Sequence, residues 1–471
     1  MTYEAEARMP IIKEDRFDVV VIGGGVSGAV AAIAAARTGS RTALIEQNAF
    51  LGGTSVSAGG MPWIGFHNKD KQFVVRGIGL EIVRHLQKIG AASEFYFDPI
   101  VSSFVVINGH WLKVMLMELM AKSGVSLYLR SLAVGTYKDG KRITAINVVT
   151  RGGVVRVEGK AFVDATDAAD VAVQAGARYI KGRLPDGRTQ VASFCIRVGN
   201  LDFTKLIAYL EQHPDQIRPF PLPQQTLAEL INRMRLGMPF ITGGMRELVA
   251  MAVRDGVKFP RDIVVGVWFP SAGEAFIVAS RVEDVDPSDP WRYAKAEMEG
   301  QLQVREIMTF IRNYLPGGEN ARLLETSHQI GIRETRHIIG YYLLTLEDLI
   351  NGKQFADRIA LGAYHVDIHP PDARGLAPFC QPPTYSIPYR SLLPVDVDGL
   401  LVAGRCISAT HEAQASTRVI PICMAIGHAA GVAASLAASL GICPHELDVR
   451  AIQQTLLAQD AELGQGIWGI K

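Results

Sequence analysis

The sequence predicts an α/β protein: a Rossmann-like dinucleotide-binding domain with an α+β region inserted into it. Three observations carry this prediction. A β-branched strand runs into a glycine-rich turn and an Ala-rich helix, the next strand ends in an acidic residue, and a second strand-then-glycine pattern appears near the opposite end of the chain. With 471 residues, 48% apolar and 20% charged, the chain is long and apolar enough to bury a large core.

Charge and cysteine content exclude several classes of protein. The 48 Lys and Arg residues nearly balance 47 Asp and Glu residues, so no nucleic-acid partner is expected. The five cysteines include no C-x-x-C pair, which indicates a reducing compartment and argues against a dithiol redox centre. Residues 1–16 lack the features of a secretory signal, and glycines interrupt the apolar stretches 17–36 and 421–443. We therefore expect a cytoplasmic protein without a membrane span.

The N-terminal elements follow from the pattern of residues. Residues 17–22 (FDVVVI) are typical of a buried parallel strand, and the Ala-rich segment after the glycines predicts a helix that ends at Gly39. A second strand is expected at 41–45 and is followed directly by Glu46. Together these elements form the complete dinucleotide fingerprint.

Each residue of the fingerprint has a physical task. Gly23 permits the tight turn, Gly25 lets the backbone approach a pyrophosphate, and Gly28 lets helix and strand pack closely. The free N–H groups at the start of the helix would bind the phosphates, and Glu46 would accept hydrogen bonds from the ribose hydroxyls. This pattern alone is compatible with either NAD or FAD.

The segments that follow favour FAD. The glycine doublets 52–53 and 59–60 would let the chain pass along a pyrophosphate and a flavin ring without side-chain bulk. Much later, LLVAGRCISAT (400–410) repeats the strand-then-glycine pattern and leads to a helix that begins near Arg418, with Pro421 in its first turn. The dipole of that helix would favour negative charge on a reduced flavin.

Seven motifs carry a family resemblance: DVVVIGGGVSG, LGGTSVSAGG, FVDATDAADVAVQAGA, QIGIRETRHIIGYYLLT, YHVDIHPPD, YSIPYRSLLP and LLVAGRCISATHEAQASTRVIPICMAIGHAAGVAA. From about residue 17 to 440 the chain resembles FAD-dependent oxidoreductases related to the fumarate reductase and succinate dehydrogenase flavoproteins. The resemblance implies a glutathione-reductase-type FAD domain, in which two distant segments hold the cofactor and a capping region lies between them.

On these motifs the expected FAD-binding residues are Gly23, Gly25, Val26, Ser27, Gly28, Glu46, Gln47, Gly52, Gly53, Thr54, Ser57, Gly59, Gly60, Ala133, Val134, Ala165, Thr166, Gly404, Arg405, Ser416 and Thr417. No histidine lies between Gly52 and Gly60, so the histidyl flavin linkage of the respiratory relatives has no candidate there. Cys406 is interpreted as a small residue near a strand end. We therefore expect noncovalent FAD.

One residue departs from the family pattern near the expected pyrophosphate site. Family members commonly read Asp-Ala-Thr-Gly-Asp, whereas this chain has Asp167 at the position of that glycine. A carboxylate there would face phosphate. Either the loop swings away, or Asp167 pairs with a base such as Arg405.

The remaining elements give a coarse domain organisation. A helix is expected at 111–123, followed by strands at 125–136 and 143–149, with a hairpin turn at 138–141 that contains Asp-Gly. The predicted regions are an N-terminal extension (1–16), the first part of the FAD domain (17–177), a capping region (178–390), the return segment of the FAD domain (391–445) and a C-terminal tail (446–471).

Missing motifs narrow the chemistry. The chain has no second G-x-G-x-x-G after a strand, no redox cysteine pair and no W-x-W-x-I-P motif of flavin halogenases. What remains is hydride transfer between a substrate carbon and flavin N5, with a side chain that handles the partner proton. The resemblance makes His411 and Arg418 first choices for binding a substrate carboxylate or carbonyl and for proton transfer. The alternative for Arg418 is a helix-terminal residue that bridges to a backbone carbonyl.

Other polar residues have two interpretations each. His365, Asp367 and His369 would share one face of a strand and form a polar pocket wall, with His369 the favoured reacting group; the ligand set is too small for a metal, so none is predicted. The helical spacing from Arg333 to His337 indicates either a clamp for an anionic substrate or an ion-paired helix face.

Two aromatic positions are less specific. Tyr389 is a candidate for the substrate side of the site. Trp63 and Trp268 fit either a pocket or a core.

The sequence thus predicts an FAD-dependent dehydrogenase or oxidase that takes a hydride from a small organic molecule and passes electrons to oxygen or a carrier. One alternative is reduction of an activated C=C bond in the manner of fumarate reductase. Another is a flavin-bound electron-transfer subunit without its own substrate. A homo-oligomer is possible.

Overall fold

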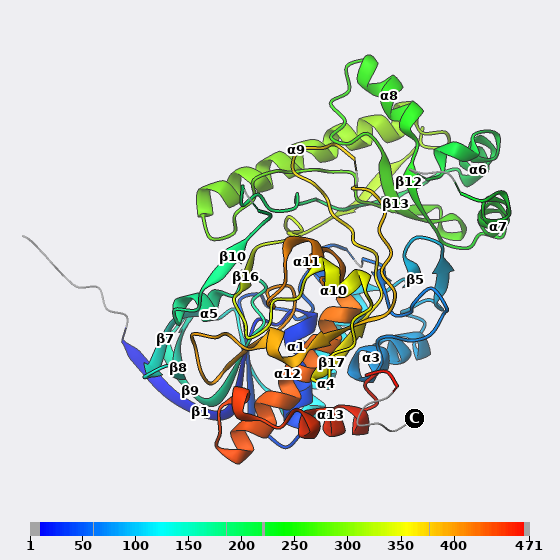
Figure 1. Cartoon of the computed structure of the whole chain (residues 1–471). Helices are drawn as coiled ribbons and strands as arrows, with labels where there is room; N and C mark the ends of the chain where they lie inside the picture. Colours follow the sequence, from blue (N-terminus) through cyan, green and yellow to red (C-terminus); the bar gives the residue numbers. More distant parts are fainter. Residues whose placement is uncertain (1–9, 60, 185, 219–221, 376, 466–471) are drawn as a thin grey trace, which may run out of the picture.

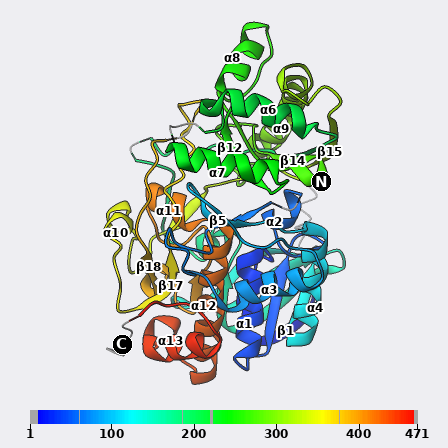
Figure 2. The same ribbon diagram turned by 90° about the vertical axis from the view of Figure 1, so that its right-hand side faces the viewer.

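The computed structural model describes residues 10–59, 61–184, 186–218, 222–375 and 377–465. It has two parts that differ in architecture. Figure 1 shows a first domain, built around a mostly parallel sheet, below a lobe formed by the green middle of the chain. The view turned by 90° shows the same division (Figure 2). We call the lobe the cap.

The first domain contains the predicted Rossmann-type sheet. Its strands are β1 (Ile11–Ile22), β2 (Thr42–Glu46), β6 (Ser126–Leu129), β7 (Leu132–Asp139), β8 (Arg142–Thr150), β9 (Gly153–Asp164) and β19 (Leu400–Val402). The order is β6-β2-β1-β9-β8-β7, and β19 pairs with the end of β9. Because β1, β2, β6, β9 and β19 run parallel, their carboxyl ends meet at one edge, where α/β sheets bind ligands.

The glycine-rich turn has the predicted geometry. Gly23 has φ +96°, and a Cβ there would lie 2.3 Å from the carbonyl oxygen of Ala165. A Cβ on Gly28, in α1 (Val26–Arg37), would lie 1.8 Å from the oxygen of Gly23, so only glycine allows helix and strand to approach this closely. The predicted tasks of Gly23 and Gly28 are therefore confirmed.

The long apolar helix α12 (Ile420–Leu440) packs against α1 in the interior of the first domain (Figure 1). A Cβ on Gly427 or Gly431 would lie 2.1 Å from the carbonyl oxygen of Ser27 or Ala31, respectively, so the two helices touch backbone to backbone. By length and hydropathy α12 could cross a membrane, but 83% of its most apolar window is buried inside the protein. It serves here as a core helix.

The cap is built on an antiparallel sheet with the order β12-β13-β14-β11-β15. Its elements are β11 (Ile196–Gly199), α6 (Phe203–Gln212), α7 (Gln224–Arg235), β12 (Phe240–Gly244), α8 (Arg246–Arg254), β13 (Val264–Phe269), β14 (Glu274–Ile277), α9 (Pro290–Tyr314) and β15 (Arg322–Thr326). One face of this sheet, which includes Phe240 and Trp268, packs into the cap's own core. Ile241 and Val267, one position along each strand, instead join the core of the first domain.

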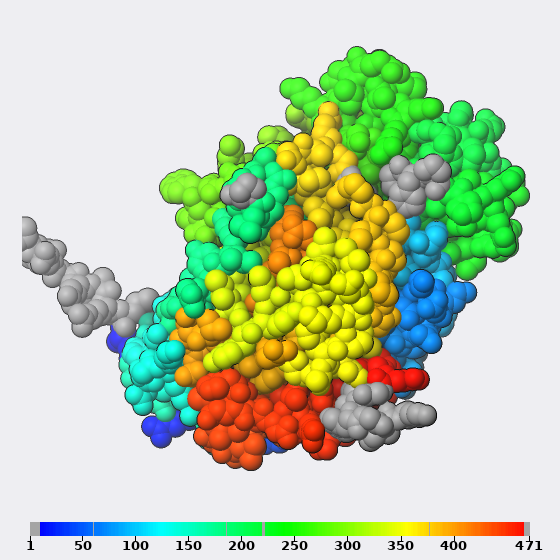
Figure 3. All heavy atoms as spheres, in the orientation of Figure 1, coloured from blue at the N-terminus to red at the C-terminus, as the bar shows by residue number. Residues whose placement is uncertain are grey.

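The remaining helices and strands lie outside these two sheets. They are α2 (Thr54–Ser57), β3 (Trp63–Ile64), α3 (Gly77–Lys88), β4 (Tyr96–Asp98), β5 (Ser102–Val105), α4 (Gly109–Ser123), α5 (Asp170–Gln174), β10 (Tyr179–Lys181), β16 (Arg336–Ile338), α10 (Leu346–Ile350), β17 (Arg358–Gly362), β18 (Tyr385–Pro388), α11 (His411–Thr417) and α13 (Val449–Ala458). On the face shown in Figure 3, the yellow to orange segment covers the junction between cap and first domain.

Several expected boundaries differ from the structure. The first strand begins at Ile11 rather than at residue 17, because the segment expected as an extension pairs with β9. The strand expected at 125–136 is two strands, of which β6 pairs with β2 and β7 forms the predicted hairpin with β8.

The domain limits also shift. The cap's core draws on residues 192–330, whereas residues 338–389, expected in the cap, pack in the first domain. The expected C-terminal tail contains α13, which packs on α12 and β17. Trp63 and Trp268 are both fully buried core residues.

Two buried histidines should make the free energy of unfolding depend on pH. Burial lowers the pKa of His67 to about 4, and burial, in spite of a hydrogen bond with Gln459, lowers the pKa of His428 to about 4. Below pH 6.5 the unfolded chain binds protons that the folded chain excludes, so the free energy of unfolding falls as pH drops from 6.5 to 4. Each histidine contributes at most about 1.4 kcal/mol per pH unit.

Denaturant unfolding of the protein and of a His67→Gln/His428→Gln double variant at several pH values checks this. The double variant should show a shallower pH dependence. An unchanged slope would contradict the assignment.

Candidate functional site

A cavity of about 740 Å³ lies at the carboxyl ends of the parallel strands and extends under the cap sheet. Its walls include the turn after β1, the segment 403–405 after β19 and cap strands β12 to β14, which lie far apart in the chain. The two glycine-bearing turns that the sequence predicted to converge therefore do so, with Gly25 and Gly404 lining one cavity.

The turn after β1 leaves room and free donors for a diphosphate. A Cβ on Gly25, the N-cap of α1, would meet no atom within 4 Å, and no side chain caps the helix start. The buried hydroxyl of Ser27 lines the cavity and has no hydrogen-bond partner among the described residues. The free N–H groups of the helix start and the Ser27 hydroxyl could donate hydrogen bonds to the phosphates of a dinucleotide, and the space at Gly25 would let those phosphates approach the backbone.

The first glycine doublet packs against this turn. The N–H of Gly52 donates to the oxygen of Gly24 at 2.8 Å, and a Cβ on Gly53 would lie 3.0 Å from the Cα of Gly25. The chain thus passes beside the turn where only glycine fits.

Glu46 is buried at the cavity wall at the end of β2. Its Oε2 accepts the N–H of Gly24 at 2.6 Å, and its Oε1 accepts the backbone and side-chain nitrogens of Asn48 at 2.7 Å. A carboxylate has about four acceptor sites, so capacity remains for a ribose hydroxyl.

Asp167 pairs with Arg405, one of the two outcomes expected for the departure from the family pattern. The Arg405 guanidinium donates to both Asp167 carboxylate oxygens, and both residues line the cavity. Asp167 has φ +80°, a conformation that favours glycine. Thr335 Oγ1 donates to the Asp167 carbonyl at 2.7 Å, which fixes the loop.

Most expected cofactor residues line the cavity. Those that do are Gly23, Gly25, Val26, Ser27, Glu46, Gln47, Gly52, Gly53, Thr54, Ala133, Ala165, Thr166, Gly404 and Arg405. The structure places Gly28, Ser57, Gly59, Val134, Ser416 and Thr417 elsewhere, and Gly60 lies outside the described residues.

The reasons for these corrections are local. Gly28 serves helix packing. Val134 is 44% exposed on β7. A Cβ on Gly59 would face the carboxylate of Glu325, and the hydroxyl of Ser416 bonds Tyr385 Oη at 2.6 Å in the core.

Comparison with known proteins decides the family. The family model described as FAD dependent oxidoreductase matches residues 18–456. The chain is an FAD-dependent oxidoreductase. The protein therefore binds FAD, and the residues around the cavity fit that cofactor as described above. A fumarate reductase relation is not part of this match.

Individual relatives of this oxidoreductase match over short stretches. It is 40% identical over 79 residues to mitochondrial dihydrolipoyl dehydrogenase of Caenorhabditis elegans. The aligned stretch covers 15% of this chain and 16% of that protein. It is 38% identical over 81 residues to 4-oxocyclohexanecarboxylate 2-dehydrogenase of Sinomonas cyclohexanicum, 17% of this chain and 14% of that protein. The matches thus span about a sixth of these relatives.

Solved structures cover more of the oxidoreductase at low identity. A geranylgeranyl bacteriochlorophyll reductase-like protein from Thermoplasma acidophilum has TM-score 0.46 and 14% identity, covering 95% of this chain and 85% of that chain. The flavin-dependent brominase Bmp2 has TM-score 0.49 and 11% identity, covering 94% and 84%.

A polar cluster forms one wall of the oxidoreductase cavity. The Arg418 Nη2 donates to the carbonyl oxygen and Oδ2 of Asp367 at 2.9 and 3.0 Å, so Arg418 both bridges to a backbone carbonyl and lines the cavity. His365 and His369 flank Asp367 on the same segment. Burial disfavours the Asp367 carboxylate, but His369, His365 and Arg418 hold its pKa well below the ordinary value.

The segment 365–369 is irregular rather than a strand, yet it does form the predicted polar wall. Among the described residues no group of three His, Cys, Asp or Glu side chains could hold a metal.

The contacts of His369 do not favour it as the reacting group that the sequence predicts. Its Nδ1 lies 3.3 Å from Arg261 Nη2, which can only donate, and its Nε2 lies 3.2 Å from Asp367 Oδ2. Both ring nitrogens are therefore committed. Burial and the nearby Arg333 guanidinium, in spite of Asp367, lower the pKa of His369 to about 3, so the ring is neutral.

His365 has the less committed ring. Its Nε2 lies 3.8 Å from Asp367 Oδ1, beyond hydrogen-bond distance, and its Nδ1 has no hydrogen-bond partner among the described residues. His365 lines the cavity beside Asp367. This arrangement suits a proton acceptor whose charged form a carboxylate stabilises.

Two further catalytic candidates are corrected by the structure. His411 lies in the first turn of α11 rather than in a loop, and its Nδ1 bonds both oxygens of buried Glu334 at 2.8 and 2.9 Å, behind the cavity wall. Tyr389 is buried, and its hydroxyl donates to the Pro444 carbonyl at 2.8 Å. Neither residue lines the cavity.

The segment with helical spacing is not a helix, because residues 336–338 form β16. Arg333 nevertheless reaches the cavity wall. Glu334 anchors the segment: burial opposes its ionisation, but hydrogen bonds with His337 and His411 lower its pKa to about 2.

Sequence reasoning missed part of the site. Arg261, fully buried behind His369, and the cavity-lining Tyr364, Cys195 and Cys423 carry no motif that would identify them. Burial keeps the pKa of Tyr364 well above its ordinary value, so its hydroxyl remains a donor. For the cap strands a signal exists: residues 264–269 (VVGVWF) are apolar on both faces, which requires cover on both faces.

Replacing Asp167 tests its part in cofactor binding. Asp167→Gly removes a negative charge from the cavity wall and releases Arg405, so FAD should bind about fivefold tighter, equivalent to about 1 kcal/mol. Titration of the apoprotein with FAD at low and high salt measures this. Asp167→Asn separates charge from backbone conformation. Weaker binding in both variants would show that the ion pair instead holds Arg405 for the cofactor.

Proposed function

We propose that this enzyme oxidises a small organic molecule bound between the cap sheet and the cavity wall that contains Arg418. The observation that carries the proposal is the continuity of the cavity: the turns that hold FAD and the cluster of His365, Asp367 and Arg418 line the same space. A substrate in it would meet both the cofactor and a proton acceptor.

FAD supplies a two-electron acceptor for a hydride leaving the substrate carbon. In the proposal, His365 accepts the proton that leaves with it, and Asp367 stabilises the resulting imidazolium. Arg418 holds a polar group of the substrate, and its Nε has no partner among the described residues. Val265 and Val267 of the cap exclude water from above. Oxygen or an electron carrier would reoxidise the enzyme.

Anaerobic mixing of the holoenzyme with a panel of alcohols, amines and acids tests the proposal. A true substrate should bleach the flavin absorbance in the absence of oxygen. The reverse reaction, reduction of an activated C=C bond, is the alternative suggested by the resemblance to fumarate reductase. Photoreduced enzyme that is reoxidised rapidly by activated alkenes, with no compound of the panel bleaching oxidised enzyme, would overturn the proposed direction.

A further inference from the structure

We infer that the substrate is an apolar molecule carrying a single carboxylate, such as an alicyclic or aromatic monocarboxylic acid. The inference rests on the proposed function, because it concerns the substrate of that same cavity. It follows from two features of the cavity: an arginine that forms no ion pair with any described residue, and an apolar surface that the cap sheet presents.

The cation that carries this inference is Arg333, which lines the cavity. Its Nη1 donates to the Val191 carbonyl at 2.6 Å and to the Ser193 hydroxyl at 2.8 Å, both neutral acceptors. Among the residues that the structure describes, it forms no ion pair. Burial and the neighbouring Arg418 and Arg261 lower the pKa of Arg333 to about 9, so it remains charged at neutral pH. The Asp367 carboxylate acts in the opposite direction, but it is already paired with Arg418, so an anionic ligand would relieve the cost of burying the Arg333 charge.

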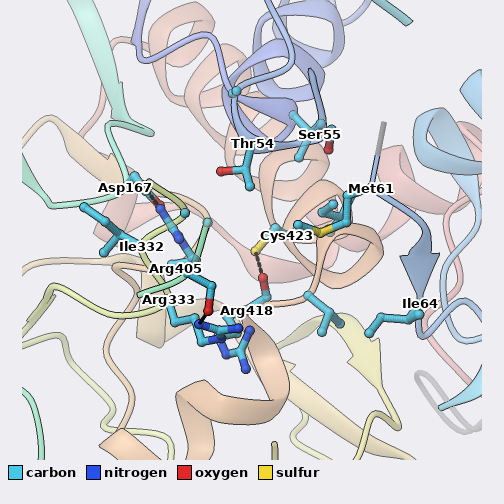
Figure 4. A pocket seen from close by; sticks show the side chains of 18 of the residues that line it. Thr54, Ser55, Met61, Ile64, Asp167, Ile332, Arg333, Arg405, Arg418 and Cys423 are labelled. Carbon is cyan, nitrogen blue, oxygen red and sulfur yellow. Dashed lines mark hydrogen bonds and ion pairs between the residues drawn. The ribbon is translucent and has the colours of Figure 1, made fainter. Parts of the chain in front are cut away.

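The other cavity cations are engaged within the protein. Arg418 pairs with Asp367, Arg405 with Asp167, and Arg218 with Asp98 at 2.5 Å. Arg246 also interacts with another residue. Arg333 is therefore the place on this wall where a ligand's negative charge is best accommodated. A carboxylate carries one charge, whereas a phosphate monoester carries up to two. The Arg418 guanidinium is close enough to lower the pKa of Arg333, and Figure 4 draws both at the same wall of the pocket. A carboxylate bound at Arg333 therefore also lies near the charge of Arg418.

The strands of the cap sheet present an apolar surface to the cavity. Ile241, Val265 and Val267 of the cap sheet line the cavity, while their strand neighbours face the cap's own core. Phe276 and Val278 continue the same surface. Figure 4 shows Met61 and Ile64 across the pocket from the arginines. These side chains offer contact area and few hydrogen bonds to a ligand.

The two features together discriminate between substrates. A short dicarboxylate would leave its second charge against the apolar surface of the cap sheet, and a sugar would leave its hydroxyls unpaired there, each at a cost in binding energy. A neutral apolar molecule would leave Arg333 without its counter-ion. Only a molecule with both parts satisfies the whole cavity.

Equilibrium binding to the oxidised holoenzyme tests this without requiring turnover. The probes are cyclohexanecarboxylate, the neutral cyclohexanecarboxamide and succinate, measured by calorimetry and by the shift of the flavin spectrum. Cyclohexanecarboxylate should bind at least tenfold tighter than either of the others. Equal or tighter binding of the amide or of succinate would overturn the inference.

Variants test which residues bind the carboxylate and which bind the apolar part of the ligand. Arg333→Gln should weaken cyclohexanecarboxylate about tenfold and leave the amide unchanged, whereas Val267→Asn should weaken both. Arg178→Gln, an exposed arginine paired with Asp396, is the control and should change nothing. An unchanged acid affinity in an FAD-loaded Arg333→Gln protein would contradict the assignment; if that variant loses FAD, the comparison of probes on the unmodified enzyme decides. Binding of the acid without flavin bleaching by any compound would overturn the proposed oxidation and leave this inference standing.

Discussion

Replacing Gly25 with Val should yield a folded protein that no longer retains FAD. Gly25 has φ −60° and ψ 175°, which an L-residue adopts freely, and its missing Cβ faces open space in the cavity. The substitution therefore costs the fold little but fills the room where the cofactor's phosphates approach the backbone. We expect FAD affinity to fall at least about 100-fold, equivalent to about 3 kcal/mol.

The flavin absorbance of the purified variant and its titration with FAD measure the effect. Gly135→Val is a matched control, because a Cβ on Gly135 also meets no atom within 4 Å but Gly135 lies outside the cavity. The control should keep its FAD. Normal FAD binding by Gly25→Val would place the diphosphate elsewhere.

Replacing His365 with Asn should nearly abolish substrate oxidation while leaving FAD bound. Loss of a proton acceptor costs about 100- to 10,000-fold in rate. The Asp367 carboxylate would keep its contacts with Arg418 and His369, so the wall should remain in place. Stopped-flow measurement of flavin reduction under anaerobic conditions, once a substrate is known, gives the rate directly.

A matched control separates loss of the proton acceptor from a general effect of replacing a histidine. His445→Asn, at a histidine paired with Asp398 outside the cavity, is the control. If His365→Asn reduced flavin at the normal rate, the proton would have another acceptor.

Local patterns predicted the cofactor half of the site well. The turn at Gly23 to Gly28, Glu46 at the end of β2, and Gly404 after β19 depend on short-range rules of strand, turn and helix that leave a clear trace in the sequence. Even the ion pair of Asp167 with Arg405 could be anticipated, because a carboxylate near a phosphate needs a partner.

The substrate half depends on contacts between distant segments, which spacing does not reveal. His411 had the expected neighbours in sequence, but Glu334 of a remote segment holds it behind the wall. His369 was favoured over His365, since nothing in the local pattern shows that fully buried Arg261 occupies one nitrogen of His369. The helical spacing from Arg333 was misleading because pairing with β10 makes residues 336–338 a strand.

A crystal structure of the purified holoenzyme tests the central claim most directly. We expect one FAD per chain, without a covalent bond, in contact with both the turn at Gly25 and the segment at Gly404. The reactive ring should lie between the cap sheet and the wall that contains His365 and Arg418. FAD bound by only one of the two segments, or a ring outside this cavity, would contradict the account.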